Sequence, residues 1–317
     1  MTMALEKAKH PPPKRRGVGD LTDLPIVEGE QCPGAVQCGV SPCVHSSECG
    51  QDLALARTSG PGTSGRKDDL LQLTLMPKTF DSPRFHVLVP CAGQGSRAGT
   101  AVPKQYQTVA GRPMLLHTLQ ALAQVPQIAD GFVVLAPDDG FVWPTAQHWP
   151  SKFVRLACGG ATRAESVFNG LSAMLAAGLS PDDWVLVHDA ARCLITPEAV
   201  SLLIETCRDD PVGGLLALPL PDTLKSHRLT EQGTRVAGTV PREDKWLAQT
   251  PQMFRLGALH SALANAATSG FEGITDESSA MERQGLSPRL VPGSAQNLKV
   301  TYPADFAFAE AVLKGKI

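Results

Sequence analysis

From residue 85 onward, the chain alternates short apolar runs with longer stretches in which apolar residues recur at helical spacing. HVLVP (86–90) and WVLVH (184–188) have the length and composition of buried strands, whereas 113–125 places its leucines on one face of a helix. The same patterns predict strands at 131–136, 152–157 and 213–220, and helices at 163–178, 196–208, 255–268, 276–284 and 303–314. Because strands alternate with helices, we expect a Rossmann-like α/β fold, a mostly parallel sheet with helices on both faces.

The loops that follow the predicted strands are where such a sheet should bind a ligand. In open α/β sheets, ligands lie beyond the carboxyl ends of the strands. The loops after residues 90, 157 and 188 should therefore converge on one site.

Residues 222–246 interrupt this alternation and predict a β-arm. The pattern favours two strands joined by a turn at 231–233. A two-stranded arm is only marginally stable in water by itself. We therefore expect it to pack on another surface. A second copy of the chain is the simplest candidate, which predicts a homodimer formed through the arm.

Residues 1–80 show no periodicity and are rich in Pro, Gly, Ser and Thr. Such a segment buries too little apolar surface to offset its ordering entropy, so we expect it to be disordered. It is alternatively a non-native extension, with translation starting at Met76. We divide the chain into this segment and a folded domain at 81–317.

Four cysteines lie in the N-terminal segment, and their spacing bears on metal binding. They are Cys32, Cys38, Cys43 and Cys49. The spacing C-x5-C-x4-C-x5-C contains no C-x-x-C pair and fits no common zinc pattern. Reduced thiols are the preferred interpretation, with a metal site left open.

The charge balance indicates neither nucleic-acid nor membrane binding. The formal net charge of the 317 residues is -2, so no basic footprint is visible. No apolar run approaches the roughly 20 residues of a membrane span. The N-terminus lacks the apolar core of a secretory signal and carries acids that transit peptides avoid. These features predict a cytoplasmic protein.

The loop PCAGQGSRAGTAVPKQ (90–105) follows a predicted strand, and a glycine-rich loop in that position usually binds phosphate. Its G-x-G-x-x-A pattern formally matches the dinucleotide fingerprint. Pro103, however, comes too soon for the helix that a dinucleotide fold requires. Residues 111–129 also lack the acid that would bind the ribose.

Two cations in this loop favour a different ligand. Arg97 and Lys104 suit a triphosphate, which carries more negative charge than the diphosphate bridge of a dinucleotide. The sequence therefore favours a nucleoside triphosphate, with a dinucleotide as the weaker alternative.

Further motifs extend this interpretation. The loop reads P-x-A-G-x-G-x-R and is followed by P-K-Q-Y; HDAAR (188–192), TPQ (250–252), ITDE (274–277) and NLKVT (297–301) come later in the chain. Together they resemble the 2-C-methyl-D-erythritol 4-phosphate cytidylyltransferase family over about residues 85–317. That family contains glycosyltransferase-A-like nucleotidyltransferases of the non-mevalonate isoprenoid pathway. Some members carry a fused cyclase domain, which we do not expect within these 317 residues.

The resemblance implies transfer of CMP from CTP to 2-C-methyl-D-erythritol 4-phosphate, with Mg²⁺. It implies catalytic roles for the cations Arg97, Lys104 and Lys299. It implies nucleotide contacts from Pro90, Cys91, Ala92, Gly93, Gly95, Gly160, Ser166, Asp189 and Ala190. Asp189 would also hold the metal, and Arg163 would lie near the base. The acceptor would be bound by Arg192, Arg242, Thr250 and Thr275, with Arg242 reaching into the partner subunit's site.

The chemistry of this reaction agrees with what the sequence contains. A phosphate already has a nucleophilic oxygen, so no general base is required, and no G-x-S-x-G motif occurs. Catalysis then depends on alignment and charge neutralisation. Asp189 follows a strand and is interpreted as functional. His188 is interpreted as a packed histidine, and Asp276 and Glu277 as favouring the start of a helix.

Some positions depart from the family, and two alternatives remain. Cys91 replaces Ala, Ala98 replaces Met, Cys193 replaces Pro, and Ala161-Thr162 replace acids, which leaves the contacts of that turn open. The first alternative is a cytidylyltransferase for a pentitol phosphate such as ribitol 5-phosphate. The second is a non-catalytic nucleotide-binding protein or a dehydrogenase.

Overall fold

The computed structural model describes residues 82–93, 103–141 and 149–315. Its centre is a seven-stranded sheet with the strand order β11-β7-β10-β6-β1-β4-β5. The strands are β1 (Phe85–Pro90), β4 (Ile128–Val134), β5 (Phe153–Leu156), β6 (Trp184–Val187), β7 (Gly213–Pro219), β10 (Trp246–Arg255) and β11 (Arg289–Pro292). Neighbouring strands are parallel except at β10, which is antiparallel to both β6 and β7. The predicted mostly parallel sheet is confirmed.

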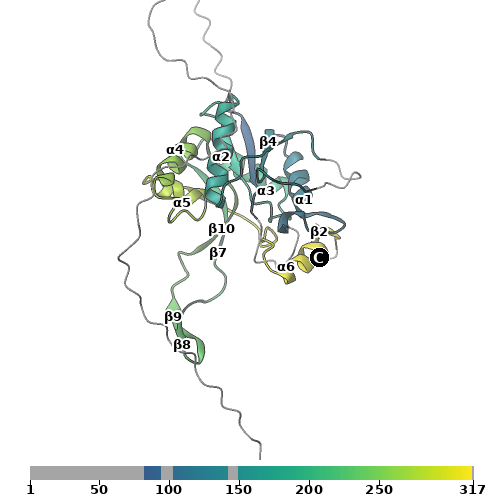
Figure 1. Ribbon diagram of the computed structural model, residues 1–317. Helices are drawn as coiled ribbons and strands as arrows, with labels where there is room; N and C mark the ends of the chain where they lie inside the picture. Colours follow the sequence, from purple (N-terminus) through teal and green to yellow (C-terminus); the bar gives the residue numbers. More distant parts are fainter. Residues whose placement is uncertain (1–81, 94–102, 142–148, 316–317) are drawn as a thin grey trace, which may run out of the picture. The chain divides into compact units, whose positions relative to one another are not determined.

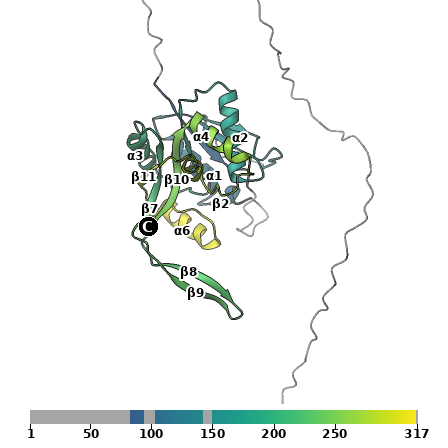
Figure 2. The same ribbon diagram turned by 90° about the vertical axis from the view of Figure 1, so that its left-hand side faces the viewer.

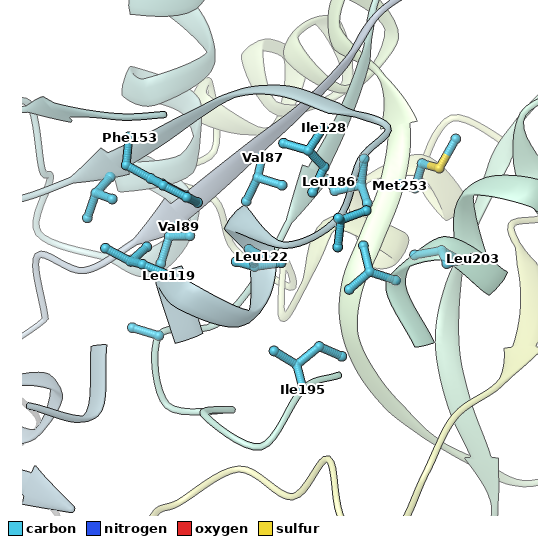
Figure 3. Close-up of a cluster of buried hydrophobic side chains, with 14 of the residues drawn as sticks. Val87, Val89, Leu119, Leu122, Ile128, Phe153, Leu186, Ile195, Leu203 and Met253 are labelled. Carbon is cyan, nitrogen blue, oxygen red and sulfur yellow. The ribbon is translucent and has the colours of Figure 1, made fainter. Parts of the chain in front are cut away.

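Helices cover both faces of this sheet. They are α1 (Met114–Ala123), α2 (Arg163–Ala176), α3 (Pro197–Cys207), α4 (Leu256–Ala267), α5 (Glu277–Glu282) and α6 (Pro303–Leu313). Successive side chains of a strand point to opposite faces. Val87 and Val89 of β1 accordingly pack with α1 and α3, as Figure 3 shows, whereas Leu88 packs with α2 and α4. The same alternation buries both faces of β1.

The predicted helix starts have a local cause. The Thr196 side chain accepts a hydrogen bond from Ala199 N at the start of α3, and Pro197 occupies the first turn. Thr162 caps α2 in the same way by accepting from Glu165 N. These caps place the amino ends of the helices beside the loops that leave the sheet. Among the described helices, none is both long and apolar enough to cross a membrane.

The apolar pattern did not indicate β10 or β11. Three polar residues of β10, Gln249, Thr250 and Gln252, are buried in place of apolar ones, and the register with β7 shifts between Ala248 and Gln252. A strand with a polar, irregular centre lacks the period-2 signal on which such a prediction depends. The short strands β2 (Thr108–Val109) and β3 (Arg112–Pro113) and the 3-10 helix η2 (Lys104–Tyr106) were also not indicated.

The predicted arm is present as an antiparallel pair, β8 (Leu224–Thr230) and β9 (Gly233–Val240). These strands pair with each other and not with the large sheet, and the pair projects away from that sheet in both views (Figures 1 and 2). Leu229 and Val236 on the arm are 80% and 60% exposed. The arm therefore presents apolar side chains to solvent in this single chain.

Candidate active site

A cavity of about 430 Å³ lies where three loops leave the carboxyl ends of β1, β5 and β6. Its lining comprises Pro90, Cys91, Ala92, Gly93, Lys104, Gln105, Gly160, Ala161, Thr162, Arg163, Ser166, Asp189, Ala190, Ala191 and Lys299. The loops after residues 90, 157 and 188 therefore converge on one cavity, as predicted. We call this space the main cavity.

The first loop is held in place by the side chain of Gln105. Its Nε2 donates hydrogen bonds of 2.9 Å to both Cys91 O and Gly93 O. Burial raises the pKa of the Cys91 thiol, so this side chain is a neutral, packed group. The glutamine of the P-K-Q-Y motif thus fixes the start of the glycine-rich loop. The predicted phosphate-binding residues Gly95 and Arg97, like the cysteines of the N-terminal segment, lie outside the described residues.

The second loop is a tight turn before α2. Gly160 N donates to Ser166 Oγ at 3.0 Å, and Ala161 N donates to Glu165 Oε2 at 2.7 Å. The Ser166 hydroxyl in turn donates to Thr162 O at 2.8 Å. Glu165 therefore reaches back from α2 and holds the turn that precedes it.

The first and second loops are in direct contact, which predicts an effect of Gly159→Ala. A Cβ at residue 159 would lie 2.2 Å from Ala92 Cβ and 2.8 Å from Leu135 O. Such overpacking typically costs about 1–3 kcal/mol, and here it would displace Ala92 from the main cavity. We expect about a tenfold weaker binding of CTP, measured by calorimetry. Gly140→Ala is the control, because a Cβ there meets nothing within 4 Å; equal CTP affinity in both variants would contradict the prediction.

Asp189 lies two residues after the end of β6 and is only 7% exposed. Its Oδ1 accepts from Arg163 Nε at 2.9 Å, and its Oδ2 lies 2.7 Å from Lys299 Nζ. Burial alone would raise the pKa of Asp189, but Arg163 and Lys299 outweigh it and hold that pKa well below its usual range. The main cavity therefore contains a carboxylate whose ionised form is favoured by two adjacent cations.

Lys104 completes the charged lining on the other side. Its Nζ donates to Val300 O at 2.7 Å, and Val300 N donates to Ala191 O at 2.9 Å. The NLKVT segment, which carries Lys299, is thereby tied both to the glycine-rich loop region and to the loop after β6. Lys104, Lys299 and Asp189 consequently face one space, as the sequence predicted.

The side chains at the main cavity determine whether it could hold the predicted magnesium ion. Among the described residues, no three His, Cys, Asp or Glu side chains cluster as metal ligands would. Magnesium is commonly held by one or two carboxylates and completes its shell with water and substrate phosphates. A single buried, ionised Asp189 at the cavity fits a magnesium ion that arrives with a nucleotide.

His188 and Thr250 lie behind Asp189. His188 is 0% exposed, and burial lowers its pKa to about 4, so the ring is neutral as its packed interpretation requires. Its Nδ1 lies 3.1 Å from Thr250 Oγ1, which accepts from Asp189 N at 3.0 Å. Thr250 is 4% exposed, so its hydroxyl positions the backbone of Asp189 in this structure.

The other residues predicted to bind the acceptor do not line the main cavity. Arg192 donates to Asn297 O at 2.7 Å and to Ala248 O at 3.2 Å. Thr275 lines a smaller cavity of about 140 Å³ on the far side of Arg163. Arg242 is exposed at the base of the arm, where it donates to Pro221 O. The structure therefore assembles the predicted nucleotide side of the site more fully than the predicted acceptor side.

Sequence reasoning missed one buried acid. Asp276 caps α5 by accepting from Ser279 N at 2.9 Å, as expected. Glu277 is different: it is 2% exposed, and its Oε1 and Oε2 accept from Arg163 Nη1 and Nη2 at 2.7 and 3.0 Å. The sequence signal for Glu277 was its place in the ITDE motif, two residues after Thr275, which was assigned to acceptor binding.

Comparisons with known proteins agree on one family. The model of the 2-C-methyl-D-erythritol 4-phosphate cytidylyltransferase family (IspD) matches residues 85–315. A bifunctional enzyme IspD/IspF of Albidiferax ferrireducens is 60% identical over 239 residues, which are 75% of this chain and 55% of that enzyme. A 2-C-methyl-D-erythritol 4-phosphate cytidylyltransferase of Laribacter hongkongensis is 56% identical over 232 residues, 73% of this chain and 96% of the relative. The chain thus spans 55% of the bifunctional relative's length.

Solved structures give the same result. A crystal structure of 4-diphosphocytidyl-2C-methyl-D-erythritol synthase is 37% identical with a TM-score of 0.63, over 73% of this chain and 99% of that one. The 2-C-methyl-D-erythritol 4-phosphate cytidylyltransferase of Thermus thermophilus is 33% identical with a TM-score of 0.59, over 73% and 99%. Together with the three-loop cavity and its charged lining, these matches show that the chain belongs to the 2-C-methyl-D-erythritol 4-phosphate cytidylyltransferase family.

Proposed function

We propose that the protein transfers CMP from CTP to 2-C-methyl-D-erythritol 4-phosphate, giving 4-diphosphocytidyl-2-C-methyl-D-erythritol and pyrophosphate. One observation carries the proposal: Lys104, Lys299 and an ionised Asp189 face a single cavity beside a glycine-rich loop. This combination suits a polyanionic nucleotide and a metal that accompanies it. Membership of the family supplies the identity of the two substrates.

In this reaction, an oxygen of the acceptor phosphate bonds to the α-phosphorus of CTP while the bond from that phosphorus to the bridging oxygen breaks. Pyrophosphate leaves with the electron pair. Lys104 and Lys299 would neutralise the charge that builds on the phosphates. Asp189 would hold Mg²⁺, which when bound would neutralise further charge on the triphosphate. No proton needs to be removed, which agrees with His188 being buried and neutral.

The backbone of the first two loops would recognise the base. Pro90, Cys91 and Ala92 border the cavity opposite Gly160 and Ser166. The Ser166 hydroxyl already bonds the turn, at Gly160 N and Thr162 O. We expect it to orient the turn for cytosine rather than to act on the phosphates.

The activity is tested by pyrophosphate release from the full chain with Mg²⁺ and CTP, offering 2-C-methyl-D-erythritol 4-phosphate or ribitol 5-phosphate. We expect release with the first acceptor alone. Release with ribitol 5-phosphate alone would support the nucleotide site and would show that the acceptor is a pentitol phosphate instead. A folded protein that binds CTP and releases no pyrophosphate with either would be a binding protein. Binding of NADH without CTP would favour the dehydrogenase.

We further propose that the protein is a homodimer formed through the arm, and that Arg242 binds the acceptor in the partner subunit's site. The exposed Leu229 and Val236 offer the arm an apolar face to bury. In a symmetric dimer, each subunit would give its arm to the other. Arg242 of the single chain lies on the arm's base and not in the lining of the main cavity.

A mixing experiment tests this arrangement. Arg242→Ala and Lys299→Ala should each be nearly inactive alone. When the two are mixed in equal amounts and allowed to exchange subunits, mixed dimers have one site with both residues intact. Random pairing then restores about a quarter of the wild-type activity. If subunits exchange, as a mass-tagged copy would show, and no activity returns, Arg242 acts within its own subunit. An Arg242→Ala variant that is active alone would show that Arg242 is not required.

A further inference from the structure

Arg163 joins two buried carboxylates at the rim of the main cavity. Its Nη1 and Nη2 are both bound by Glu277, at 2.7 and 3.0 Å, and its Nε donates to Asp189 Oδ1 at 2.9 Å. The Asp189 and Glu277 side chains are 10% and 2% exposed. A guanidinium offers five N–H donors in a fixed plane, so the pair with Glu277 determines which edge faces Asp189.

This geometry determines which carboxylate oxygen of Asp189 is available to a metal ion. A guanidinium and a carboxylate prefer two parallel hydrogen bonds. With its two Nη atoms bound end-on to Glu277, Arg163 presents its Nε edge to Asp189 and donates to Oδ1. The other oxygen, Oδ2, lies 2.7 Å from Lys299 Nζ, so in this structure it is paired with a different cation.

We infer that Glu277 is a positioning residue: it holds Arg163 so that this arginine binds one oxygen of Asp189 and leaves the other for a metal ion. The inference rests on the proposed function, because it concerns the carboxylate assigned to Mg²⁺. Glu277 does not line the main cavity; it lines the smaller cavity with Thr275. We therefore expect it to affect the nucleotide site through Arg163.

The charges of the group give a second reason. Arg163 and Lys299 carry two positive charges, and Asp189 and Glu277 two negative ones, so the four side chains are neutral together. Without the charge of Glu277, the group would be cationic. A divalent cation would then be held less well, while a triphosphate would be held at least as well.

Replacing Glu277 should therefore change the Mg²⁺ dependence of CTP binding, which a simple loss of stability would not do. In Glu277→Gln, the released Nη atoms would turn to the nearest buried carboxylate, Asp189, and occupy Oδ2. We expect the Mg²⁺ concentration that half-saturates CTP binding to rise about tenfold, as is typical for residues that orient a metal ligand. Binding of CTP in the absence of Mg²⁺ should be unchanged or tighter. Calorimetry of CTP binding across a Mg²⁺ series measures both quantities on the full chain.

A matched control distinguishes a positioning role of Glu277 from a contribution to stability alone. Asp183 is also a buried carboxylate, 6% exposed, and accepts from Arg84 N at 2.9 Å at the amino end of β6. Asp183→Asn should lower the denaturation midpoint without changing the Mg²⁺ requirement. If Glu277→Gln behaves like Asp183→Asn, with lower stability and an unchanged Mg²⁺ requirement, Glu277 is structural only and the inference is wrong.

A double variant keeps the test informative if Glu277→Gln does not fold. Arg163→Gln with Glu277→Gln removes the buried charge and the group that would block Oδ2, and it leaves the remaining pair, Asp189 and Lys299, neutral. We expect its Mg²⁺ requirement to be lower than that expected for Glu277→Gln alone. A requirement raised as far as expected for Glu277→Gln alone would overturn the inference. Wild-type protein that binds no CTP would instead refute the proposed function.

Discussion

Lys299→Ala should lower turnover about a thousandfold while the fold survives. Lys299 lies at the main cavity with its Nζ 2.7 Å from Asp189 Oδ2, and its side chain is 40% exposed. Removing one fixed charge that stabilises a transition state typically costs a factor of about 10²–10³ in rate. Loss of the Lys299 cation also leaves less positive charge beside the Asp189 carboxylate. Because the pair is partly exposed, its loss should change the free energy of unfolding by only about 1 kcal/mol or less.

The measurement is pyrophosphate release at saturating CTP and acceptor, with unfolding in urea as the check on the fold. Lys152→Ala is the matched control. Its Nζ donates to a backbone carbonyl, Ile128 O at 3.2 Å, and lies at the amino end of the sheet, away from the main cavity. Turnover of Lys299→Ala within a few-fold of Lys152→Ala would refute the charge-neutralising role of Lys299.

Asp189→Asn should have an effect at least as large. The asparagine keeps the shape of the side chain and the backbone bond from residue 189 to Thr250 Oγ1. It removes the negative charge that a divalent cation needs and that Arg163 and Lys299 now balance. We expect turnover to fall about a thousandfold or more, because in the proposed mechanism Asp189 is the carboxylate that would hold Mg²⁺.

A second measurement distinguishes this effect from general damage to the site. Asp189→Asn should still bind CTP in the absence of Mg²⁺, and the added Mg²⁺ should no longer strengthen binding. Arg163 keeps its two bonds to Glu277 in this variant, so no guanidinium is left buried and unpaired. If Mg²⁺ strengthens CTP binding in Asp189→Asn as much as in the wild type, Asp189 is not the metal ligand.

The two variants separate roles that the sequence assigned by resemblance. Lys299→Ala removes a cation that the nucleotide should meet, so CTP binding should weaken with and without Mg²⁺. Asp189→Asn removes an anion, so only the part of binding that depends on Mg²⁺ should be lost. This contrast follows from the sign of each charge, and does not require the acceptor to be identified.

Much of the fold could be predicted because its signals are local. The apolar runs at 86–90 and 184–188 became β1 and β6, and Thr196 and Pro197 start α3 as expected. The loops at the carboxyl ends of parallel strands lie at the same edge of a sheet, which is why the site's location followed from the alternation of strands and helices. The strand β10 could not be predicted, because Gln249, Thr250 and Gln252 are buried there by partners that are distant in the sequence.

The sequence by itself determined the alternation of strands and helices, the hairpin of the arm, and the motifs that place Lys104, Asp189 and Lys299 around one cavity. Only the tertiary structure decided that Glu277 holds Arg163, and that Thr250 lies behind Asp189. The physical reason is the range of the interactions. Caps and periodic burial act within a few residues, whereas the Arg163–Glu277 pair joins residues 114 positions apart and forms only when the sheet brings their helices together.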